Sequence, residues 1–397
     1  MRDLLWIPPV AACLVCVPCA ADTPKQDPVI DCDFPGGNIV VDRIEGDHVY
    51  LHQDGRDTPG FWFYWCFRVS GGAGRTVTFH FTKGNVLGAR GPAVSTDGGK
   101  TWAWLGKDAV KGTSFAYTFP EKSRAVHFCL AIPYQESHLR EFLERFADNP
   151  HLEVEEHSTT KKGRKTERLR FGRLKGEPAH RVLLTARHHS CEMMASYALE
   201  GVIEAVLGDT AEGKWLCENV EFAAVPLMDT DGVEDGDQGK NRKPHDHNRD
   251  YLGKPIYSSV AALKEFVPKW SRGNLKIAID MHCPWIRGGR NEQVFFVGGR
   301  SPEMWQRQQQ FSKTLQEVQT GPLVHDPRHN IPWGKEWNNL KEPKSCGSWT
   351  ALQPGILVGV SIEIPYANAG GKPVTAGSAR LLGHDLARTI HRFLQTP

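Results

Sequence analysis

The chain has 397 residues, of which 40% are hydrophobic and 24% are charged, an ordinary balance for a globular protein long enough for two domains. Its 48 Lys and Arg residues against 46 Asp and Glu residues leave a formal charge of +2. This near neutrality gives no electrostatic reason to expect a nucleic acid or an anionic membrane surface as partner. Beyond residue 22 the sequence has no run of 18 apolar residues, so we expect no membrane span in the mature chain.

The amino terminus has the pattern of a secretory signal peptide. A short polar start precedes an almost wholly apolar stretch at residues 4–21, and a polar break follows. We expect residues 1–21 to be a signal peptide cleaved near Ala20 or Ala21, which would make the protein secreted or periplasmic. A lipobox-like segment ending at Cys13 leaves lipid attachment as a less favoured alternative, and absence of export as another.

The cysteines do not predict a disulfide framework. Three of the ten lie in the leader, and the odd number beyond it contains no CxxC pair, which excludes a zinc ribbon. We expect most of them to be buried thiols, while up to three bridges stay open in an oxidising compartment. The seven mature cysteines are Cys32, Cys66, Cys129, Cys191, Cys217, Cys283 and Cys346.

The first part of the mature chain favours β-structure. Short runs rich in aromatic and β-branched residues are separated by Gly-rich turns, a spacing typical of a small antiparallel β-sandwich. We assign this N-terminal domain to residues 22–135. The expected elements are strands at 38–41, 60–69, 76–81 and 125–133, a hairpin at 95–102, and a following helix at 136–146.

After about residue 150, apolar strand-length runs alternate with helical stretches, which predicts an α/β domain with a largely buried sheet flanked by helices. We assign this domain to residues 136–397. A basic turn at 161–165 is expected to be a solvated hairpin tip, with a phosphate or substrate patch as the alternative. The expected strands are 151–157, 166–171, 182–185, 220–227, 275–280, 293–297 and 356–364, and the expected helices are 192–207, 302–318 and 378–394.

The strongest chemical signal is a His-x-x-Glu motif, His189 to Glu192, which follows a strand and opens a helix. Side chains three residues apart at a helix start can reach one ion, and His282 closes another apolar strand. Two imidazoles and one carboxylate, with a fourth position open for water, form a ligand set of catalytic zinc. Sites in α/β sheets lie at the carboxyl ends of strands, which favours this interpretation over a chance pair on a helix surface.

Three further segments support the same hypothesis. The strand expected at 220–227 runs into an Asp-Gly turn within 225–233, and the charged loop at 239–251 is long for a simple connector. Glu363 lies in the middle of an apolar strand, where burial of its charge costs several kcal/mol unless it is paired. Glu363 is therefore either a general base or a residue on the solvated face of an edge strand.

The order of these motifs, ARxHxxE, PxxxxDG, NRD, DxHxx and IE, resembles the zinc carboxypeptidases of the M14 type, in particular the cytosolic carboxypeptidase-like branch. The aromatic strand at 62–69 resembles the extra sandwich domain of that branch, and 128–134 resembles its junction into the catalytic domain. The resemblance covers nearly the whole mature chain. It implies a mixed central sheet flanked by helices behind the sandwich, and a hydrolase that releases residues from peptide or protein carboxyl ends.

The resemblance also implies individual roles. His189, Glu192 and His282 would bind Zn²⁺, which lowers the pKa of bound water to about 7 and polarises the scissile carbonyl. Asn248 and Arg249 would hold the terminal carboxylate of the substrate, since a guanidinium fork matches a carboxylate with two parallel hydrogen bonds.

Two further catalytic roles follow from the resemblance. Glu363 would be the base that activates the zinc-bound water, a contribution of roughly 10²–10⁴ in rate. Arg242 would be a second cation that stabilises the oxyanion. Asp280, two residues before His282, is expected to support a ligand or the structure rather than to bind zinc.

The chain departs from the family pattern at several positions. It has Asp-Thr-Asp-Gly at 229–232, where the family has Asn-Pro-Asp-Gly. For the tyrosine that many relatives place before the base, Trp349 is only a weak candidate. His245 and His247 form an HxH pair that could compete for the metal, whereas His188 is expected to pack or hydrogen-bond.

Three functions remain open at this stage. The favoured one is a secreted zinc metallocarboxypeptidase. The alternatives are a related zinc amidase or deacylase acting on N-acyl amino acids or cell-wall peptides, and a binding protein that keeps the fold without turnover. Relatives often remove acidic residues, which would require a basic specificity pocket. Because export is expected, we do not transfer the tubulin substrate of cytosolic members.

Overall fold

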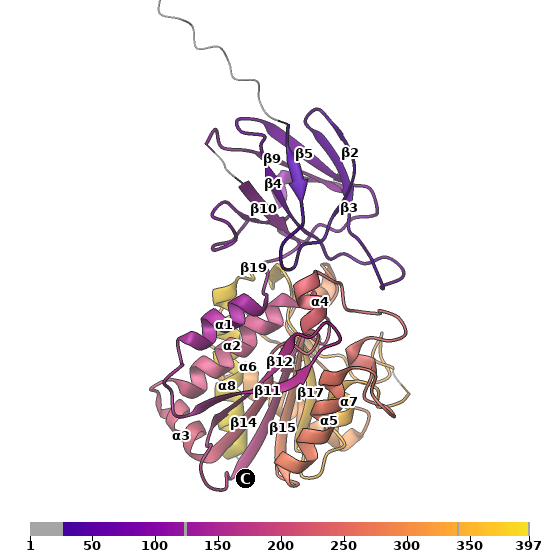
Figure 1. Ribbon diagram of the computed structural model, residues 1–397. Helices are drawn as coiled ribbons and strands as arrows, with labels where there is room; N and C mark the ends of the chain where they lie inside the picture. Colours follow the sequence, from indigo (N-terminus) through magenta and orange to yellow (C-terminus); the bar gives the residue numbers. More distant parts are fainter. Residues whose placement is uncertain (1–26, 123–124, 340, 396–397) are drawn as a thin grey trace, which may run out of the picture.

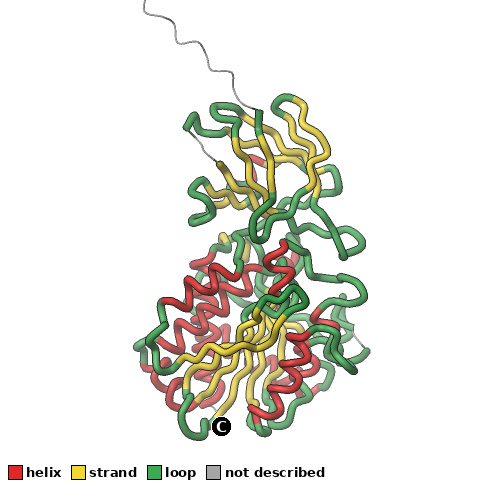
Figure 2. Tube along the Cα trace, in the orientation of Figure 1, coloured by secondary structure: helices red, strands yellow, loops and turns green. Residues whose placement is uncertain are grey.

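The computed structural model describes residues 27–122, 125–339 and 341–395. A β-sandwich is followed by a larger α/β region, and the sandwich lies against one end of the larger region (Figures 1 and 2). The expected signal peptide, residues 1–21, lies outside the described residues. Among the described helices, none is both long and apolar enough to cross a membrane.

The sandwich consists of two five-stranded sheets that bury an aromatic core. Alternate residues of one strand, Val77, Phe79 and Phe81, point inward, and Phe79 packs on Phe115 and Phe128. The first sheet has the spatial order β1 (Val29–Asp31), β4 (Cys66–Ser70), β10 (Ala125–Cys129), β6 (Ala93–Ser95) and β7 (Ala103–Trp104). The second has the order β2 (Val40–Glu45), β3 (His48–His52), β5 (Thr76–Phe81), β9 (Ser114–Thr118) and β8 (Val110–Lys111), with a 3₁₀ turn at Lys107–Ala109.

The sandwich differs from its sequence-based prediction in two respects. One strand pair, β3 with β5, is parallel, because the chain crosses to the other sheet to form β4 before it returns. The predicted strand at 60–69 is regular only from Cys66 onward. The backbone N–H groups of Phe63 and Tyr64 instead donate to the side-chain oxygen of Gln238, at 3.1 and 2.9 Å, so no neighbouring strand pairs with them.

The central sheet of the larger region has seven strands and is mixed, as expected. Its middle strands β14, β13, β15 and β17 are parallel, whereas β11, β12 and β16 pair antiparallel at the edges. The spatial order is β11 (Leu152–Thr159), β12 (Lys165–Gly172), β14 (Val220–Val225), β13 (His180–Ala186), β15 (Leu275–His282), β17 (Val358–Glu363) and β16 (Phe295–Val297).

Helices cover both faces of this sheet (Figure 1). One layer is built around α8, which contacts α2, α3 and α6, and the other face carries α5 and α7. The first layer comprises α2 (Met193–Leu207), α3 (Ala211–Asn219), α6 (Pro302–Val318) and α8 (Ala376–Gln395). The remaining elements are α5 (Ser258–Ser271), α7 (Cys346–Thr350), α1 (Glu136–Glu144), α4 (Thr230–Asp235), the β18 (Asn368–Ala369) and β19 (Lys372–Pro373) hairpin, and 3₁₀ turns at His247–Arg249, Gly289–Glu292 and Pro327–His329.

Because side chains alternate along the middle strands, the core residues and the predicted site residues lie on opposite faces of the sheet. Ile277, Ile279 and Met281 of β15 belong to the same hydrophobic cluster as α2 and α8, whereas Ala278 packs with α5. Because successive side chains of a strand point to opposite faces, Asp280 and His282 lie on the α5 and α7 side. Likewise, Val358, Val360 and Ile362 of β17 belong to the hydrophobic cluster that includes α6 and α8, so Gly359, Ser361 and Glu363 share the opposite face.

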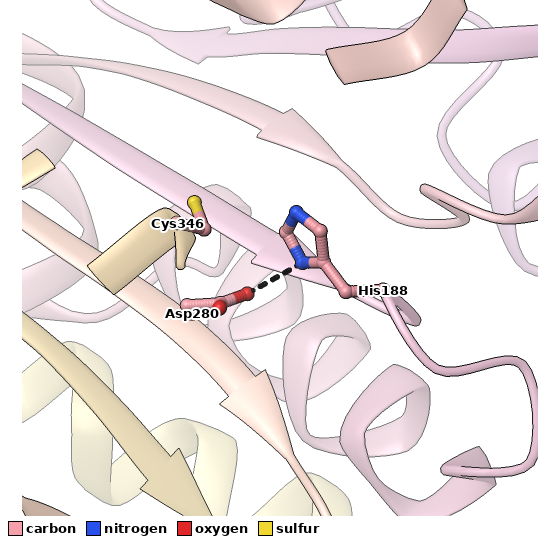
Figure 3. Close-up of side chains that lie close together, drawn as sticks. All are labelled: His188, Asp280 and Cys346. Carbon is pink, nitrogen blue, oxygen red and sulfur yellow. Dashed lines mark ion pairs between the residues drawn. The ribbon is translucent and has the colours of Figure 1, made fainter. Parts of the chain in front are cut away.

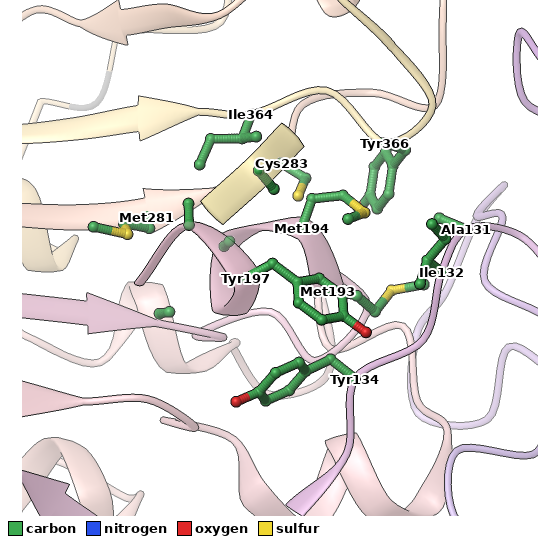
Figure 4. Close-up of a cluster of buried hydrophobic side chains, with 14 of the residues drawn as sticks. Ala131, Ile132, Tyr134, Met193, Met194, Tyr197, Met281, Cys283, Ile364 and Tyr366 are labelled. Atoms are coloured by element: carbon green, nitrogen blue, oxygen red, sulfur yellow. The ribbon is translucent and has the colours of Figure 1, made fainter. Parts of the chain in front are cut away.

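The sandwich is joined to the larger region by a continuous core (Figure 4). Ala131, Ile132 and Tyr134, from the segment after β10, lie near Met193, Met194 and Tyr197 of α2 and near Cys283, Ile364 and Tyr366, and all of these side chains are buried. Hydrogen bonds also cross the junction. The Asn38 side chain donates to the Gly236 carbonyl at 2.7 Å, and the Gly36 N–H donates to the Glu234 carbonyl at 2.8 Å. The sandwich therefore braces α4 and the start of the loop that follows it.

Candidate active site

Three parallel strands, β13, β15 and β17, end at one edge of the sheet, and the predicted site residues lie at or just beyond these ends. Ala186 of β13 is opposite Met281 of β15, and His282 of β15 is directly opposite Glu363 of β17. The His-x-x-Glu motif begins at His189, three residues after the last residue of β13. The register alone therefore brings the two imidazoles and the two glutamates, which lie far apart in the sequence, to the same edge.

The turn after β13 directs its two histidines to different places. Arg187 has a φ of 61°, a left-handed conformation that costs a non-glycine residue about 1–3 kcal/mol. Its buried guanidinium offsets this cost, because it donates to the carbonyls of Ser190 and Tyr134, at 3.0 and 2.9 Å. After this turn, His188 contacts Asp280 and His189 contacts Glu192.

His189, Glu192 and His282 form a buried cluster whose ligand atoms lie within 4.8 Å of one another. The Nδ1 atoms of His189 and His282 lie 2.9 and 2.7 Å from the two oxygens of the Glu192 carboxylate. Burial alone would raise the pKa of this carboxyl group, but His189 and the neighbouring Lys240 hold it well below its usual range. Two imidazoles turned toward one ionised carboxylate are a donor set that fits Zn²⁺.

Carboxylates lie behind both imidazoles, and Asp280 is within hydrogen-bond distance of His282. His282 Nε2 lies 2.7 Å from Asp280 Oδ2, and His189 Nε2 lies 3.5 Å from Asp246 Oδ1. The other oxygen of Asp280 accepts a hydrogen bond from Thr185, at 2.8 Å. A carboxylate on the far nitrogen fixes the tautomer that leaves the near nitrogen free to bind a metal. This position agrees with the supporting role expected for Asp280.

Figure 3 shows a second group of possible metal ligands, His188, Asp280 and Cys346, which adjoins the first through the contact of Asp280 with His282. His188 Nδ1 is 2.8 Å from Asp280 Oδ1, and its Nε2 is 2.6 Å from the Tyr251 hydroxyl. Burial raises the pKa of the Cys346 thiol well above its usual value, whereas metals bind the thiolate. These contacts fit a hydrogen-bonded support for His282, and they agree with the hydrogen-bonding role expected for His188.

Glu363 and Lys240 complete the charged surroundings of the cluster. Glu363 is buried, and among the described residues no hydrogen-bond partner exists for its Oε2. Burial raises the pKa of Glu363, which increases its basicity. Lys240 Nζ lies 2.7 Å from Glu192 Oε1 and donates to the Cys283 carbonyl at 3.1 Å. Burial opposes its charge, but Glu192 and Glu363 raise the pKa of Lys240 above its usual value, so it is cationic.

Lys240 was not identified by the sequence analysis, because its position depends on a close approach of two loops. Gly239 has a φ of 74°, and a Cβ atom there would collide with the backbone nitrogen and the hydroxyl of Ser190. The missing side chain lets the loop lie directly on the His-x-x-Glu turn, which places the next residue at the cluster. The sequence signal that could have indicated this position of Lys240 is a glycine directly before a lysine in a long charged loop.

Arg242, the expected second cation, is bound to other carboxylates. Its guanidinium lies 2.8 Å from Asp229, 3.1 Å from Asp237 and 3.5 Å from Asp57. Burial would lower its pKa, but Asp229 in particular raises it. The geometry thus puts Lys240 in contact with the cluster, while the oxyanion role of Arg242 stays a prediction.

The two residues expected to bind a carboxylate lie beside the cluster but differ in their surroundings. Asn248 is buried, with its Nδ2 at 3.1 Å from His282 Nε2 and its Oδ1 accepting from the Cys346 N–H at 2.8 Å. Arg249 is half-buried, lines the adjacent cavity and donates to the Asn248 carbonyl at 2.9 Å. The guanidinium of Arg249 is therefore better exposed to a ligand than the amide of Asn248.

The remaining candidates have structural contacts elsewhere. His245 pairs with Asp250 at 2.7 Å, and the His247 ring stacks on Tyr257 with their centroids 3.6 Å apart. Trp349 packs on Tyr251, with ring centroids 5.4 Å apart, in the core beside α5.

The basic turn at 161–165 is more than a solvated tip, because it packs against α4. Lys162 pairs with Asp235 at 2.6 Å, and Arg164 pairs with Asp231 at 2.9 Å.

A cavity of about 1140 Å³ opens onto the cluster. His189, His282, Glu363 and Arg249 are among the residues that line it. Four tryptophans stand around it, and one of them comes from the sandwich. They are Trp62, Trp285, Trp333 and Trp337. Both regions of the chain therefore contribute to the space in which a substrate would bind.

Comparison with protein families matches residues 139–281 to zinc carboxypeptidase. Among curated proteins, cytosolic carboxypeptidase 3 of Mus musculus is 26% identical over 211 residues, which are 49% of this chain and 20% of the mouse protein. Cytosolic carboxypeptidase 3 of Bos taurus is 24% identical over 326 residues, 70% of this chain and 32% of the bovine protein. The chain thus spans less than a third of the length of these relatives.

Solved structures show the same fold across both regions. A metallo-carboxypeptidase from Burkholderia cenocepacia superposes with a TM-score of 0.79 at 20% identity, and the match covers 94% of this chain and 100% of that one. A metallo-carboxypeptidase from Pseudomonas aeruginosa, in complex with (2-guanidinoethylmercapto)succinic acid, gives a TM-score of 0.76 at 22% identity, with 92% and 99% coverage.

We predict that the purified protein binds one Zn²⁺ per chain, measured by elemental analysis after dialysis. His282→Ala should lower the zinc content at least about tenfold, because it removes one of three ligands. His245→Ala serves as the matched control and should keep the metal, since His245 pairs with Asp250. If His245→Ala loses zinc and His282→Ala keeps it, the metal lies in the HxH loop instead.

Proposed function

We propose that the protein is a zinc-dependent metallocarboxypeptidase that removes single residues from peptide carboxyl ends. Its residues 139–281 match the zinc carboxypeptidase family. One observation carries this proposal. His189 and His282 of the cluster with Glu192 line the same cavity as Arg249 and Glu363, and Glu363 Oε2 has no hydrogen-bond partner among the described residues.

His189, Glu192 and His282 would hold the metal, which supplies Lewis acidity toward the scissile carbonyl and lowers the pKa of water. Glu363 would do the proton transfer. Its Oε2 accepts a proton from the attacking water as the new C–O bond forms, and then gives this proton to the amine nitrogen as the C–N bond breaks. Burial, which makes Glu363 more basic than an exposed carboxylate, favours the first of these transfers.

Lys240 would stabilise the negative charge that develops on the carbonyl oxygen. Its ammonium group contacts Glu192 and approaches Glu363, in surroundings from which most water is excluded. A fixed positive charge is more effective there than in bulk water and needs no reorganisation during the reaction. The family pattern assigns an arginine to this task, and in this chain Arg242 is already paired with three carboxylates.

Arg249 would make the enzyme an exopeptidase. A guanidinium binds a carboxylate through two parallel charge-assisted hydrogen bonds, which an internal peptide bond does not offer. Asn248 fixes the position of Arg249, because it is itself held by α7 and lies against His282. A related zinc amidase that cleaves N-acyl amino acids would use the same anchor, and the choice of leaving group separates the two functions.

The pattern of residues 1–21 leads us to propose export as part of this function, which would place the substrate outside the cytosol. The N-terminal residue of the mature chain tests this.

Glu363→Gln should lower kcat on a short peptide roughly 10²–10⁴-fold, because glutamine does not accept the proton of the attacking water. The zinc content should stay at the wild-type level, since Glu363 is outside the proposed ligand set. Steady-state kinetics with parallel metal analysis gives both values. An unchanged kcat would remove Glu363 from the role of base.

Lys240→Met should lower kcat roughly 10²–10³-fold while keeping zinc bound, because it removes the charge that faces the oxyanion. Lys240→Arg retains a cation and serves as the control, which should recover most of the rate. If Lys240→Met keeps full activity and Arg242→Gln loses it, the oxyanion role belongs to Arg242 after all.

Arg249→Gln should lower kcat/KM for a peptide with a free terminal carboxylate by about 10–100-fold, the value of a lost charge-assisted pair. The same peptide with a terminal amide should be a poor substrate for both forms and should be affected little. Release of the terminal residue is followed by mass spectrometry. Equal losses on the two peptides would contradict the carboxylate anchor and favour the amidase.

A further inference from the structure

The cavity continues from the cluster along the β17 strand. Gly359, Ser361 and Glu363 share one face of this strand, and all three line the cavity. Residues of one face repeat about every 6.5–7 Å along a strand. A substrate side chain next to Glu363 would therefore extend over Ser361 and then over Gly359.

The same part of the cavity adjoins the proposed carboxylate anchor. The Cys346 N–H at the start of α7 donates to Asn248 Oδ1 at 2.8 Å. The next residue, Gly347, lies against β17, because a Cβ atom there would be 2.6 Å from Ser361 Oγ. The wall from the anchor at 248–249 to Ser361 is thus continuous, and glycine and serine keep it free of large side chains.

The part of this pocket around Gly359 is lined by uncharged residues whose polar groups are already bonded. The Gln308 side chain donates to the Gly359 carbonyl at 2.5 Å and accepts from the Gly299 N–H at 2.7 Å, so both ends of its amide are occupied. Met304 Sδ accepts from the Gly359 N–H at 3.4 Å. Met304 and Ala351 supply apolar surface, and a Cβ atom on Gly359 would be 3.1 Å from Ala351 Cβ.

The cationic side chains that line the rest of the cavity are paired or exposed. Arg290 pairs with Glu336 at 2.7 Å, and Arg242 is held by three carboxylates. Lys243 and Arg300 are exposed, and the Arg300 guanidinium lies 5.4 Å from the centre of the Trp333 ring. Among the described residues, none of these four side chains hydrogen-bonds to Gln308, and Arg300, which follows Gly299 in the chain, is exposed.

We infer that the pocket between α6, α7 and β17 receives the side chain of the terminal residue and selects uncharged, apolar side chains. This inference rests on the proposed carboxypeptidase function and names its substrate class. A terminal Glu or Lys would lose its hydration there without gaining an opposite charge, which is unfavourable. The basic specificity pocket that the family resemblance implied is therefore not what these residues form.

The test uses the zinc-bound full chain and a set of peptides that differ only in the last residue. We expect kcat/KM for terminal Leu, Met or Phe to exceed that for terminal Glu or Lys at least about 100-fold, as for a site that leaves a buried polar group unpaired. A preference for Glu or Lys would overturn the inference while leaving the carboxypeptidase function intact. Release from none of the peptides would overturn the proposed function, and the inference with it.

A charge placed in the part of the pocket around Gly359 should change the selectivity. Met304→Lys should raise the Glu/Leu ratio of kcat/KM at least about tenfold, because it gives a terminal carboxylate a partner. Met304→Leu preserves volume without charge and should keep the wild-type order.

Ala351→Lys adds the same charge from a half-exposed position and keeps the test open if Met304→Lys does not fold. An unchanged Glu/Leu ratio in a folded, active variant would mean that the terminal side chain binds elsewhere.

Discussion

The in-register parallel pairing of β13, β15 and β17 is the constraint on which the site depends. Side chains alternate along a strand, so a slip of one residue in β15 or β17 would move His282 or Glu363 to the opposite face. That face is packed against α2 and α8 and has no room for ionised groups. Burial of Ile279 and Ile362 therefore fixes the register, and the same register brings the imidazole and the carboxylate together. Packing and chemistry are determined by one pattern.

The site concentrates charge where solvent is largely excluded, and it is stable because nearly every charge has a partner. Isolated buried ions cost several kcal/mol each, whereas here Lys240 faces Glu192 and Asp280 faces two imidazoles. Glu363 Oε2 is an exception, a buried carboxylate oxygen with no hydrogen bond among the described residues. The base of the proposed reaction is thus the carboxylate whose interactions are left incomplete. A substrate and its attacking water would complete them.

Sequence patterns predicted the elements that carry strong periodicity and strand-end motifs. The helix at 302–318 is found with the predicted bounds, because it combines a Ser301 cap, a first-turn proline and regular apolar spacing. The mixed sheet and its polar strand ends were also anticipated. By contrast, α5 was missed, since Pro268 near its end reads as a helix breaker, and α4 was missed because it has only six residues.

Tertiary contacts determined what the patterns did not contain. The run at 60–69 reads as one strand, but its first half binds Gln238 from a distant loop. Lys240 has no distinguishing local signal, and its contact with Glu192 depends on Gly239 meeting Ser190. Nor does the sequence show that Arg242 and Arg290 are paired, because that depends on which acidic residue lies beside each arginine.

The contacts between the sandwich and the loop after α4 limit how the two regions of such chains can be recombined. Arg56 pairs with Asp237 at 2.6 Å, the Lys243 N–H donates to the Asp57 carbonyl at 3.1 Å, and Gln238 spans the boundary. This loop also carries Lys240 and Arg249, so its shape is set partly by residues that lie nearly two hundred positions earlier. The two regions therefore depend on each other, and a chimera that joins the larger region to a foreign accessory domain would have to carry the matching surface with it.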